Sequence, residues 1–492
     1  MKKIGFLIVL ASLALCAVLM FWPDRELPPA SDTLMAASER MDEITISAEL
    51  NPDERTLSVI QTMKLTNRTG ETLDSLVLRT WPNAFQSMDH SPCAADEALY
   101  DLHYPDGFSS GSLVMARATV NAEEVIHRYE DEAKTVMRLP VSIGWEPGET
   151  IGVHLVYTVQ IPRAAYRFGV QEDVWMLGNA FALPAAWEDG AFRTDAYAPV
   201  GDPFVSDCAN YEVWVTVPSG YVCAGSGYPQ QENDGDRVHY AFWSRAIRDF
   251  ALVISPKYET AQAMEKGVLV TAYADSASKA NELLKYARKA IACYTQRFGA
   301  YPYPSYTVAQ AEFPHDGMEY PALSMIGSDV IRRGGRELEY AVAHETAHQW
   351  WYAAVGSDSW NQPWQDEALA AFSVLEYAQT VYGMGERQEL ERTGPMSAMQ
   401  VTVSQGVTPG APLDRFASMS EYKLVVYDRG AACLCALDET VSGGLDAFLR
   451  DYYETYAFSR ASRQDFETLL LQSTGEDLAP LMRDYLDTNL LN

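Results

Sequence analysis

The spacing of two histidines and a distant glutamate constrains this chain more than any other feature. His344, Glu345 and His348 form a His-Glu-x-x-His run, and Glu367 follows after eighteen intervening residues. On a helix, residues i and i+4 lie one turn apart on the same face, so the two imidazoles point the same way. A carboxylate from a second helix then completes a three-ligand site for Zn²⁺ with one position left open. The spacing therefore predicts two neighbouring helices around one metal ion.

Glu345 lies about 100° further round the helix than His344, given 3.6 residues per turn. It need not be a ligand, and it can act on the attacking water as general base and then as general acid. The alternative is a helix whose histidines are buried for structural reasons. An apolar helical stretch at 337–355 and a second one from Asp366 to about Tyr382 favour the metal site. The motif indicates a metallopeptidase with one Zn²⁺ per chain.

Three segments resemble one known family. The run HETAHQWWYAAVG…WNQPWQDEALA is similar to the pattern of the M1 aminopeptidases. Upstream, DGMEY at 316–320 resembles that family's GxMEN segment, and YDRGA at 427–431 resembles its tyrosine segment. Tyr320 stands where the family has asparagine, and Ala368-Leu369 replace its Gly-Phe. The β-rich N-terminal part also resembles the family's first domain, so the resemblance covers most of residues 41–492.

The resemblance implies a role for each matched residue. Tyr427 would donate to the oxyanion of the tetrahedral intermediate, with Tyr422 as the alternative. Glu319 would pair with the free α-ammonium of a peptide, and Gly317 would let the backbone approach the substrate closely. For the family's second amine contact, in its β domain, the sequence offers only Asn179. The expected metal ligands are His344, His348 and Glu367, the catalytic residues Glu345 and Tyr427, and the substrate-binding residues Gly317, Met318, Glu319 and Asn179.

The leading hypothesis is a zinc-dependent aminopeptidase that acts on peptides with free N-termini. A zinc endopeptidase of the same fold is the alternative if Glu319 does not face the metal. A third hypothesis is an inactive, surface-tethered module that binds peptides. The formal net charge of −30 argues against nucleic acid as a partner. The oligomeric state stays open.

The first residues of the chain predict a membrane association. Lys2 and Lys3 precede an uncharged run at residues 4–22, which is long enough to cross a bilayer as a helix. We expect a single-pass anchor at 1–23, with the catalytic part outside the cytoplasm, followed by a linker at 24–40. A cleaved signal peptide and a secreted protein are the alternative. Apart from Cys16, the six cysteines show no C-x-x-C spacing, although Cys208 and Cys223 flank one strand and could pair.

Hydrophobic periodicity predicts the fold class. Residues 41–256 alternate with period two between turn signals, which indicates an antiparallel β-sandwich. A helical period begins near residue 275, with Asp275 or Ser276 as N-cap and Gly299 just past the end, and a strand with alternating burial is expected from Tyr306 to Phe313. We expect a multidomain α+β protein whose thermolysin-like, α-rich catalytic domain spans 257–492. The sequence ends where the family's large helical domain often begins, so this short form should have an open cleft with weak size discrimination.

Overall fold

The computed structural model describes residues 30–94 and 97–488. From Ser31 onward these residues form one compact unit. The membrane segment expected at residues 4–22, and Cys16 within it, lie outside the described residues. Among those described, no helix is both long and apolar enough to cross a membrane. The six cysteines in the described part, including Cys208 and Cys223, are free thiols.

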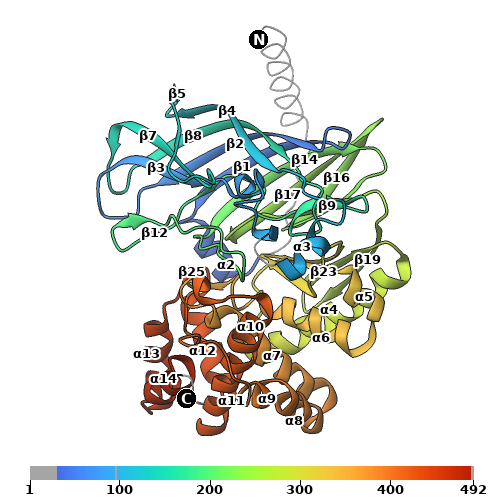
Figure 1. Cartoon of the computed structure of the whole chain (residues 1–492). Helices are drawn as coiled ribbons and strands as arrows, with labels where there is room; N and C mark the ends of the chain where they lie inside the picture. Colours follow the sequence, from blue (N-terminus) through green and yellow to red (C-terminus); the bar gives the residue numbers. More distant parts are fainter. Residues whose placement is uncertain (1–29, 95–96, 489–492) are drawn as a thin grey trace. The chain divides into compact units, whose positions relative to one another are not determined.

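The β-rich part is built on an eight-stranded sheet (Figure 1). Buried and exposed residues alternate along its central strands, as the period-two pattern predicted, because one face packs on the core. The sheet is antiparallel except for one parallel pairing, between β1 and β14. In order across the sheet, the strands are β16 (Tyr228–Asp234), β17 (Arg237–Ile247), β14 (Ala209–Pro218), β1 (Asp42–Asn51), β2 (Thr56–Thr66), β8 (Thr150–Gln160), β4 (Ser112–Val120) and β5 (Glu123–Glu124).

Two four-stranded sheets and a two-stranded sheet of β12 (Trp187–Glu188) and β13 (Ala191–Phe192) complete the β-rich part. The first runs β11 (Leu183–Pro184), β3 (Leu73–Arg79), β7 (Val136–Trp145), β6 (Arg128–Tyr129). The second runs β15 (Val222–Gly225), β18 (Leu252–Ser255), β10 (Val174–Leu177), β9 (Phe168–Gln171). Two short α-helices and the 3₁₀-helices η1 (Trp81–Phe85) and η2 (Pro92–Ala94) also occur among the described residues of this half. Helix α2 (Asp32–Ser38) lies within the segment expected to be a linker, and α3 (Glu97–His103) lies within the segment expected to be free of helices.

A five-stranded mixed sheet joins the β-rich part to the helices. Its order is β19 (Glu259–Glu265), β20 (Val268–Ala274), β21 (Ser305–Ala311), β23 (Leu323–Gly327), β22 (Gly317–Tyr320). Strand β21 is buried at every position, so the alternation expected there was wrong: its two neighbours are both parallel, and both of its faces are covered. Strand β22, which contains Glu319, is one of the two edge strands and pairs antiparallel with β23.

Helices make up most of the C-terminal half (Figure 1, orange to red). Helix α4 begins after Ser276 and ends before Gly299, as predicted, and its apolar face is buried. Helix α6 ends at Ala347 rather than continuing to Val355, because His348 is its C-cap and Val355–Gly356 (β24) pairs with β25 (Ser459–Arg460). The helices are α4 (Ala277–Phe298), α5 (Ser328–Arg333), α6 (Gly335–Ala347), α7 (Trp364–Tyr382), α8 (Met384–Thr393), α9 (Pro395–Ala398), α10 (Met419–Tyr422), the π-helix η4 (Lys423–Arg429), α11 (Gly430–Thr440), α12 (Asp446–Tyr456), α13 (Arg463–Thr474) and α14 (Ala479–Leu486).

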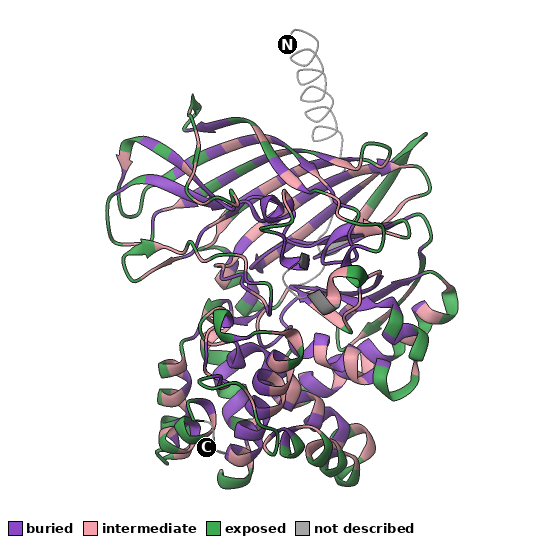
Figure 2. Ribbon diagram, in the orientation of Figure 1, coloured by how far each residue is buried: buried purple, intermediate pink, exposed green. Residues whose placement is uncertain are grey.

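The fold class expected from periodicity is confirmed: a β-rich half is followed by an α-rich half. Figure 2 shows buried residues concentrated along the strands of the large sheet and along the inner faces of the helices. The largest fully buried side chains include Trp350, Trp351 and Trp364. Each of the three lies two or three residues from a predicted metal ligand in the sequence. The aromatic core therefore holds rigid the two helices that carry those ligands.

Candidate metal centre and active site

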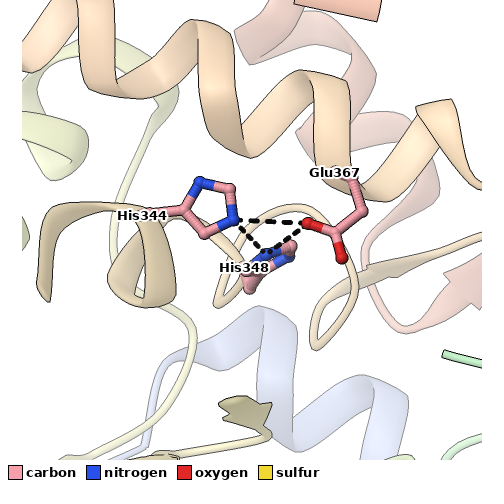
Figure 3. A group of neighbouring side chains, drawn as sticks. All are labelled: His344, His348 and Glu367. Atoms are coloured by element: carbon pink, nitrogen blue, oxygen red, sulfur yellow. Dashed lines mark hydrogen bonds and ion pairs between the residues drawn. The ribbon is translucent and has the colours of Figure 1, made fainter. Parts of the chain in front are cut away.

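Three side chains from two helices converge on one point (Figure 3). The Nε2 atoms of His344 and His348 lie 3.1 Å apart. Glu367 Oε2 lies 3.3 Å from the first and 3.4 Å from the second. The histidines come from the end of α6 and the glutamate from the first turn of α7. The two-helix arrangement that the spacing predicted is thus present.

A further carboxylate orients the second histidine. Asp366 Oδ1 lies 2.6 Å from His348 Nδ1, and the backbone carbonyl of Trp351 lies 3.1 Å from the same nitrogen. Because both partners are acceptors, Nδ1 carries the proton and Nε2 keeps its lone pair for a metal. Burial raises the pKa of the Asp366 carboxyl to about 6, against the opposing effect of His348.

The donor set fits Zn²⁺. Two imidazole nitrogens and one carboxylate oxygen within 4.8 Å of one another are the ligand types of a catalytic zinc site. Burial disfavours the charged form of Glu367, yet hydrogen bonds with His344 and His348 hold its pKa below its usual range, so it is ionised. Burial lowers the pKa of His344, which keeps that imidazole neutral, as a ligand must be.

Glu345 lies beside the ligands without joining them. Its side chain is buried, and its Oε2 atom has no hydrogen-bond partner among the described residues. A side chain at Gly317 would collide with the Glu345 carboxylate, so glycine is required at that position. Burial raises the pKa of Glu345 to about 8. An unpartnered carboxyl held next to the ligands is placed to exchange a proton with a reacting group.

These groups open onto one cavity of about 470 Å³. Its wall includes Gly317, Met318, His344, Glu345 and Tyr427. The cavity also receives side chains from the β-rich half, among them Tyr166, Arg167 and Asp202. The site therefore has a space for a substrate between the two halves of the unit.

We call the side chains of His344, His348 and Glu367 the ligand triangle. Two further carboxylates lie next to it. Carboxylate oxygens of Asp202, Glu319 and Glu367 all lie within 4.8 Å of one another. Asp202 is held by an ion pair with the buried Arg167. Burial raises the pKa of Glu319 well above its usual range; His348 opposes this shift, and the charges of Asp202 and Glu367 add to it. The sequence placed Glu319 here but gave no sign of Asp202.

Tyr427 lies against the ligands on a π-helix. Its hydroxyl donates to Glu367 Oε1 at 2.5 Å, and its ring stacks on His344 with centroids 5.4 Å apart and planes 9° apart. Tyr422, the alternative, is buried and packs edge-on against the Tyr427 ring at 5.7 Å. Of the two, Tyr427 is the one whose hydroxyl already contacts a metal ligand.

Asn179 has a different position from the one expected of a residue that binds substrate. Its side chain is buried, its amide donates to Asp249 at 2.7 Å, and its oxygen accepts from the Tyr320 hydroxyl at 3.0 Å. It is not among the residues that line the cavity. Gly178 leaves the space that the Tyr320 hydroxyl occupies, since a Cβ there would overlap it. Tyr320, which stands where the family has asparagine, therefore bonds to Asn179 and keeps it away from the cavity. The carboxylate that lies next to Glu319 is that of Asp202 instead.

Two residues of the site were missed in the sequence. Asp366 directly precedes Glu367, and a carboxylate beside a ligand-bearing helix turn is the usual partner of a metal-binding histidine, so that signal was available. Asp202 lies in a Gly-Asp-Pro loop that no local pattern links to the metal site. Only the tertiary fold brings it there.

Residues 282–485 match the family described as Peptidase family M1 domain. Aminopeptidase RNPEPL1 of Homo sapiens is 28% identical over 185 residues, which are 34% of this chain and 24% of that protein. Aminopeptidase N of Lactobacillus helveticus is 25% identical over 287 residues, 52% of this chain and 33% of that protein. The first of these matches spans only about a quarter of the relative's length.

Solved structures match over a larger share of the chain. The crystal structure of the M1 zinc metallopeptidase from Deinococcus radiodurans has a TM-score of 0.64 at 19% identity, covering 92% of this chain and 96% of that one. A mutant of the same protein bound to a Tyr-Ser-Ala substrate gives a TM-score of 0.63 at 18% identity, with 92% and 95% covered. At such identities the likeness concerns the fold, which extends through both halves.

Proposed function

We propose, from the premise that the chain belongs to peptidase family M1 through residues 282–485, that it is a zinc-dependent aminopeptidase. It hydrolyses the first peptide bond of peptides with free N-termini. One observation supports the exopeptidase activity above all. Two carboxylates that are not metal ligands, Asp202 and Glu319, crowd together beside the ligand triangle.

His344, His348 and Glu367 would hold Zn²⁺, which would supply Lewis-acid chemistry toward the scissile carbonyl and the attacking water. The buried Glu345 carboxylate takes a proton from the attacking water and passes it to the leaving amine. Tyr427 leaves its bond with Glu367 and donates its hydroxyl to the developing oxyanion.

The carboxylates of Asp202 and Glu319 explain how the protein would recognise a free N-terminus. Two like charges in a buried site repel each other unless a cation lies between them. An α-ammonium at that position would form charge-assisted hydrogen bonds to both carboxylates. Arg167 engages one side of Asp202 and fixes its orientation, so the pair is preorganised. The amine then lies one residue away from the bond that is cut.

The direct test compares free and blocked N-termini. The full-length protein should hydrolyse aminoacyl reporter substrates, lose that activity with a chelator, and leave N-acetylated peptides intact. Glu319→Gln and Asp202→Asn should raise KM for peptides with free N-termini. The ratio of kcat/KM between free and N-acetylated peptides should therefore become smaller. Glu337→Gln, a carboxylate on the same cavity wall, is the matched control and should keep the preference.

Other outcomes would identify the alternatives. Rapid cleavage of blocked peptides inside the chain would show a zinc endopeptidase. Peptide binding without hydrolysis that responds to a chelator would show a binding module. An unchanged preference in both Glu319→Gln and Asp202→Asn would mean that another group binds the amine.

We also propose that residues 4–22 anchor the protein in a membrane, with the catalytic part on the exported side. The support is the length of the uncharged run and the two lysines before it. The full chain should pellet with membranes and resist a carbonate wash, whereas a chain that begins at residue 24 should not. Recovery of a shortened, freely secreted protein would favour a cleaved signal instead.

A further inference from the structure

A second pair of histidines faces each other outside the catalytic triangle. His103, the last residue of α3, and His315, in the loop between β21 and β22, point their Nε2 atoms at each other at 3.1 Å. The two residues are 212 positions apart in the chain and belong to different halves of the unit. The same distance, 3.1 Å, separates the Nε2 atoms of His344 and His348. The proposed function does not use this pair.

The hydrogen bond of His103 sets its tautomer. Its Nδ1 atom lies 3.4 Å from the backbone carbonyl of Cys93, which can only accept. Nδ1 therefore carries the proton, and the lone pair of Nε2 points at His315. His348 is prepared in the same way, with Nδ1 on the carbonyl of Trp351 and Nε2 on the metal side.

We propose that His103 and His315 form a second, weaker metal site that takes Zn²⁺ or a similar transition-metal ion. Two Zn–N bonds of about 2.0–2.1 Å in tetrahedral geometry place their nitrogens roughly 3.3 Å apart, close to the separation seen here. Within the described part of the chain, no third His, Cys, Asp or Glu ligand atom joins the two imidazoles. Water or a small anion would fill the remaining positions.

The surroundings explain why this site should be weak. Burial lowers the pKa of His315 well below its usual range, and the charges of Arg167 and Lys423 add to this shift. The imidazole is therefore neutral, the form that binds a metal. The same positive groups repel a cation. The described residues also provide no carboxylate ligand for this pair, whereas Glu367 provides one for His344 and His348. The site should fill only after the catalytic one.

A metal at this position would link two segments beside the active site. His315 lies on the wall of the catalytic cavity, two residues before Gly317. The link would tie α3 of the β-rich half to the loop that leads into β22, the strand that carries Glu319. Binding of an ion to the folded state alone raises the temperature of unfolding.

The experiment is equilibrium dialysis of the full chain against rising Zn²⁺, with metal content measured per chain. Wild type should bind one equivalent tightly and a second at higher concentration. His315→Asn and His103→Asn should lose the second equivalent and keep the first, which also shows that they are folded. His90→Asn, an exposed histidine, is the matched control and should keep both. Excess Zn²⁺ should raise the unfolding temperature of wild type and His90→Asn but not of His315→Asn.

His103 is buried, so its replacement can prevent folding. In that case the result for His315→Asn decides the test, because His315 is only half-buried. Cu²⁺ added to the zinc-loaded wild type should show nitrogen ligands by electron paramagnetic resonance, and this signal should be lost in His315→Asn. A single equivalent of Zn²⁺ in wild type at every concentration would overturn the proposal and leave a plain hydrogen bond between the rings. A second equivalent that persists in His315→Asn would overturn it as well.

Discussion

Single residues in this site differ in whether their hydrogen bonds are satisfied. His348 is held at Nδ1 by two acceptors, and Glu367 lies next to both histidine Nε2 atoms and accepts a bond from Tyr427. Glu345, in the helix that ends at His348, keeps one buried oxygen without a partner among the described residues. Ligands need fixed positions, whereas a proton carrier needs a free lone pair.

This difference yields a prediction for Glu345→Gln. The variant should retain zinc, because Glu345 is not one of the three converging ligands. Its kcat should fall by about 10²–10⁴-fold, since an amide cannot accept the proton of the attacking water. Metal analysis and steady-state kinetics on an aminoacyl reporter measure both effects. Loss of zinc in this variant would contradict the assigned role.

Tyr427→Phe should separate transition-state stabilisation from substrate binding. In the resting site the hydroxyl donates to Glu367 at 2.5 Å, so it contributes to the oxyanion only after it moves. We expect kcat to fall by about 10²–10³-fold with KM nearly unchanged and zinc retained. An effect on KM alone would assign Tyr427 to binding. Tyr422→Phe, next to it but buried, is the comparison.

The convergence of His344, His348 and Glu367 was predictable from sequence because helical geometry fixes it locally. His344 and His348 must share a face once the helix forms, and Glu367 needs only a neighbouring helix. Glu319 and Tyr427 were found through the family resemblance rather than through geometry. Asp202 was not found, because its contact with Glu319 depends on how a loop of the β-rich half packs against the other half.

At the scale of elements, the π-helix η4 sets where the tyrosines point. A π-turn has a longer repeat than an α-turn, and such turns are frequent at functional sites. Here Tyr422 ends α10 and Tyr427 lies within η4, so the Tyr427 ring stacks on His344 and the Tyr422 ring packs behind it against Tyr427. Directly after η4, Gly430 begins α11 and lies against Ala368 of α7. The close contact sets the distance between Tyr427 and the helix that carries Glu367.

Gly430→Ala should therefore disturb activity through helix packing. An added Cβ would lie 2.6 Å from the Cβ of Ala368, so α11 and η4 must shift away from α7. We expect a loss of about 1–3 kcal/mol in unfolding free energy and a fall in kcat. Gly385→Ala in α8, where an added Cβ meets nothing within 4 Å, is the control. It should be neutral or slightly stabilising. Equal effects in the two variants, measured by denaturation and kinetics, would contradict this account.

Element boundaries show where periodicity stops being informative. Helix α4 was predicted with both ends because its caps and its single apolar face are local signals. Helix α6 was predicted too long, since the apolar residues after His348 belong to a turn buried under other elements. Strand β21 was assigned an alternation that it lacks, because a central strand is covered on both sides.

Across the whole Ser31–Asn492 unit, the two halves meet through groups buried on the β-rich side. Arg248 donates to backbone carbonyls of the helical half, among them Tyr352 at 2.8 Å and Ala354 at 3.2 Å. Asp249, the next residue, accepts from Asn179 and from the Phe250 backbone. Burial raises the pKa of Asp249 to about 7.

This shift predicts a pH dependence of stability. Because the pKa of Asp249 is higher in the folded chain than its ordinary value of about 3.9, the folded state binds the proton more tightly. The resulting stability is complete below about pH 4 and is lost as the pH rises through about 7. Asp249→Asn carries no such proton. Its unfolding free energy should fall less than that of wild type as the pH rises over this range. The two falls should differ by an amount on the order of a few kcal/mol.

Denaturation curves at several pH values between 4 and 7 measure the difference. Asp236→Asn, an exposed carboxylate of the same half, is the control and should follow the wild-type dependence. Parallel curves for wild type and Asp249→Asn would show that Asp249 stays ionised in the folded chain.

The positions of Asp202 and Arg167 have a consequence for how such a chain can diversify. Both residues belong to the β-rich half, whereas His344, Glu345, His348 and Glu367 lie in the helical half. Under the proposed function, Asp202, one of the two carboxylates that select an N-terminus, can mutate separately from the groups that break the bond, whereas Glu319 lies in β22 beside them. Substitutions in the loop around Asp202 can change the preferred peptides while the catalytic centre stays intact. Substitutions confined to the β-rich half can thus change the substrate preference of the protein.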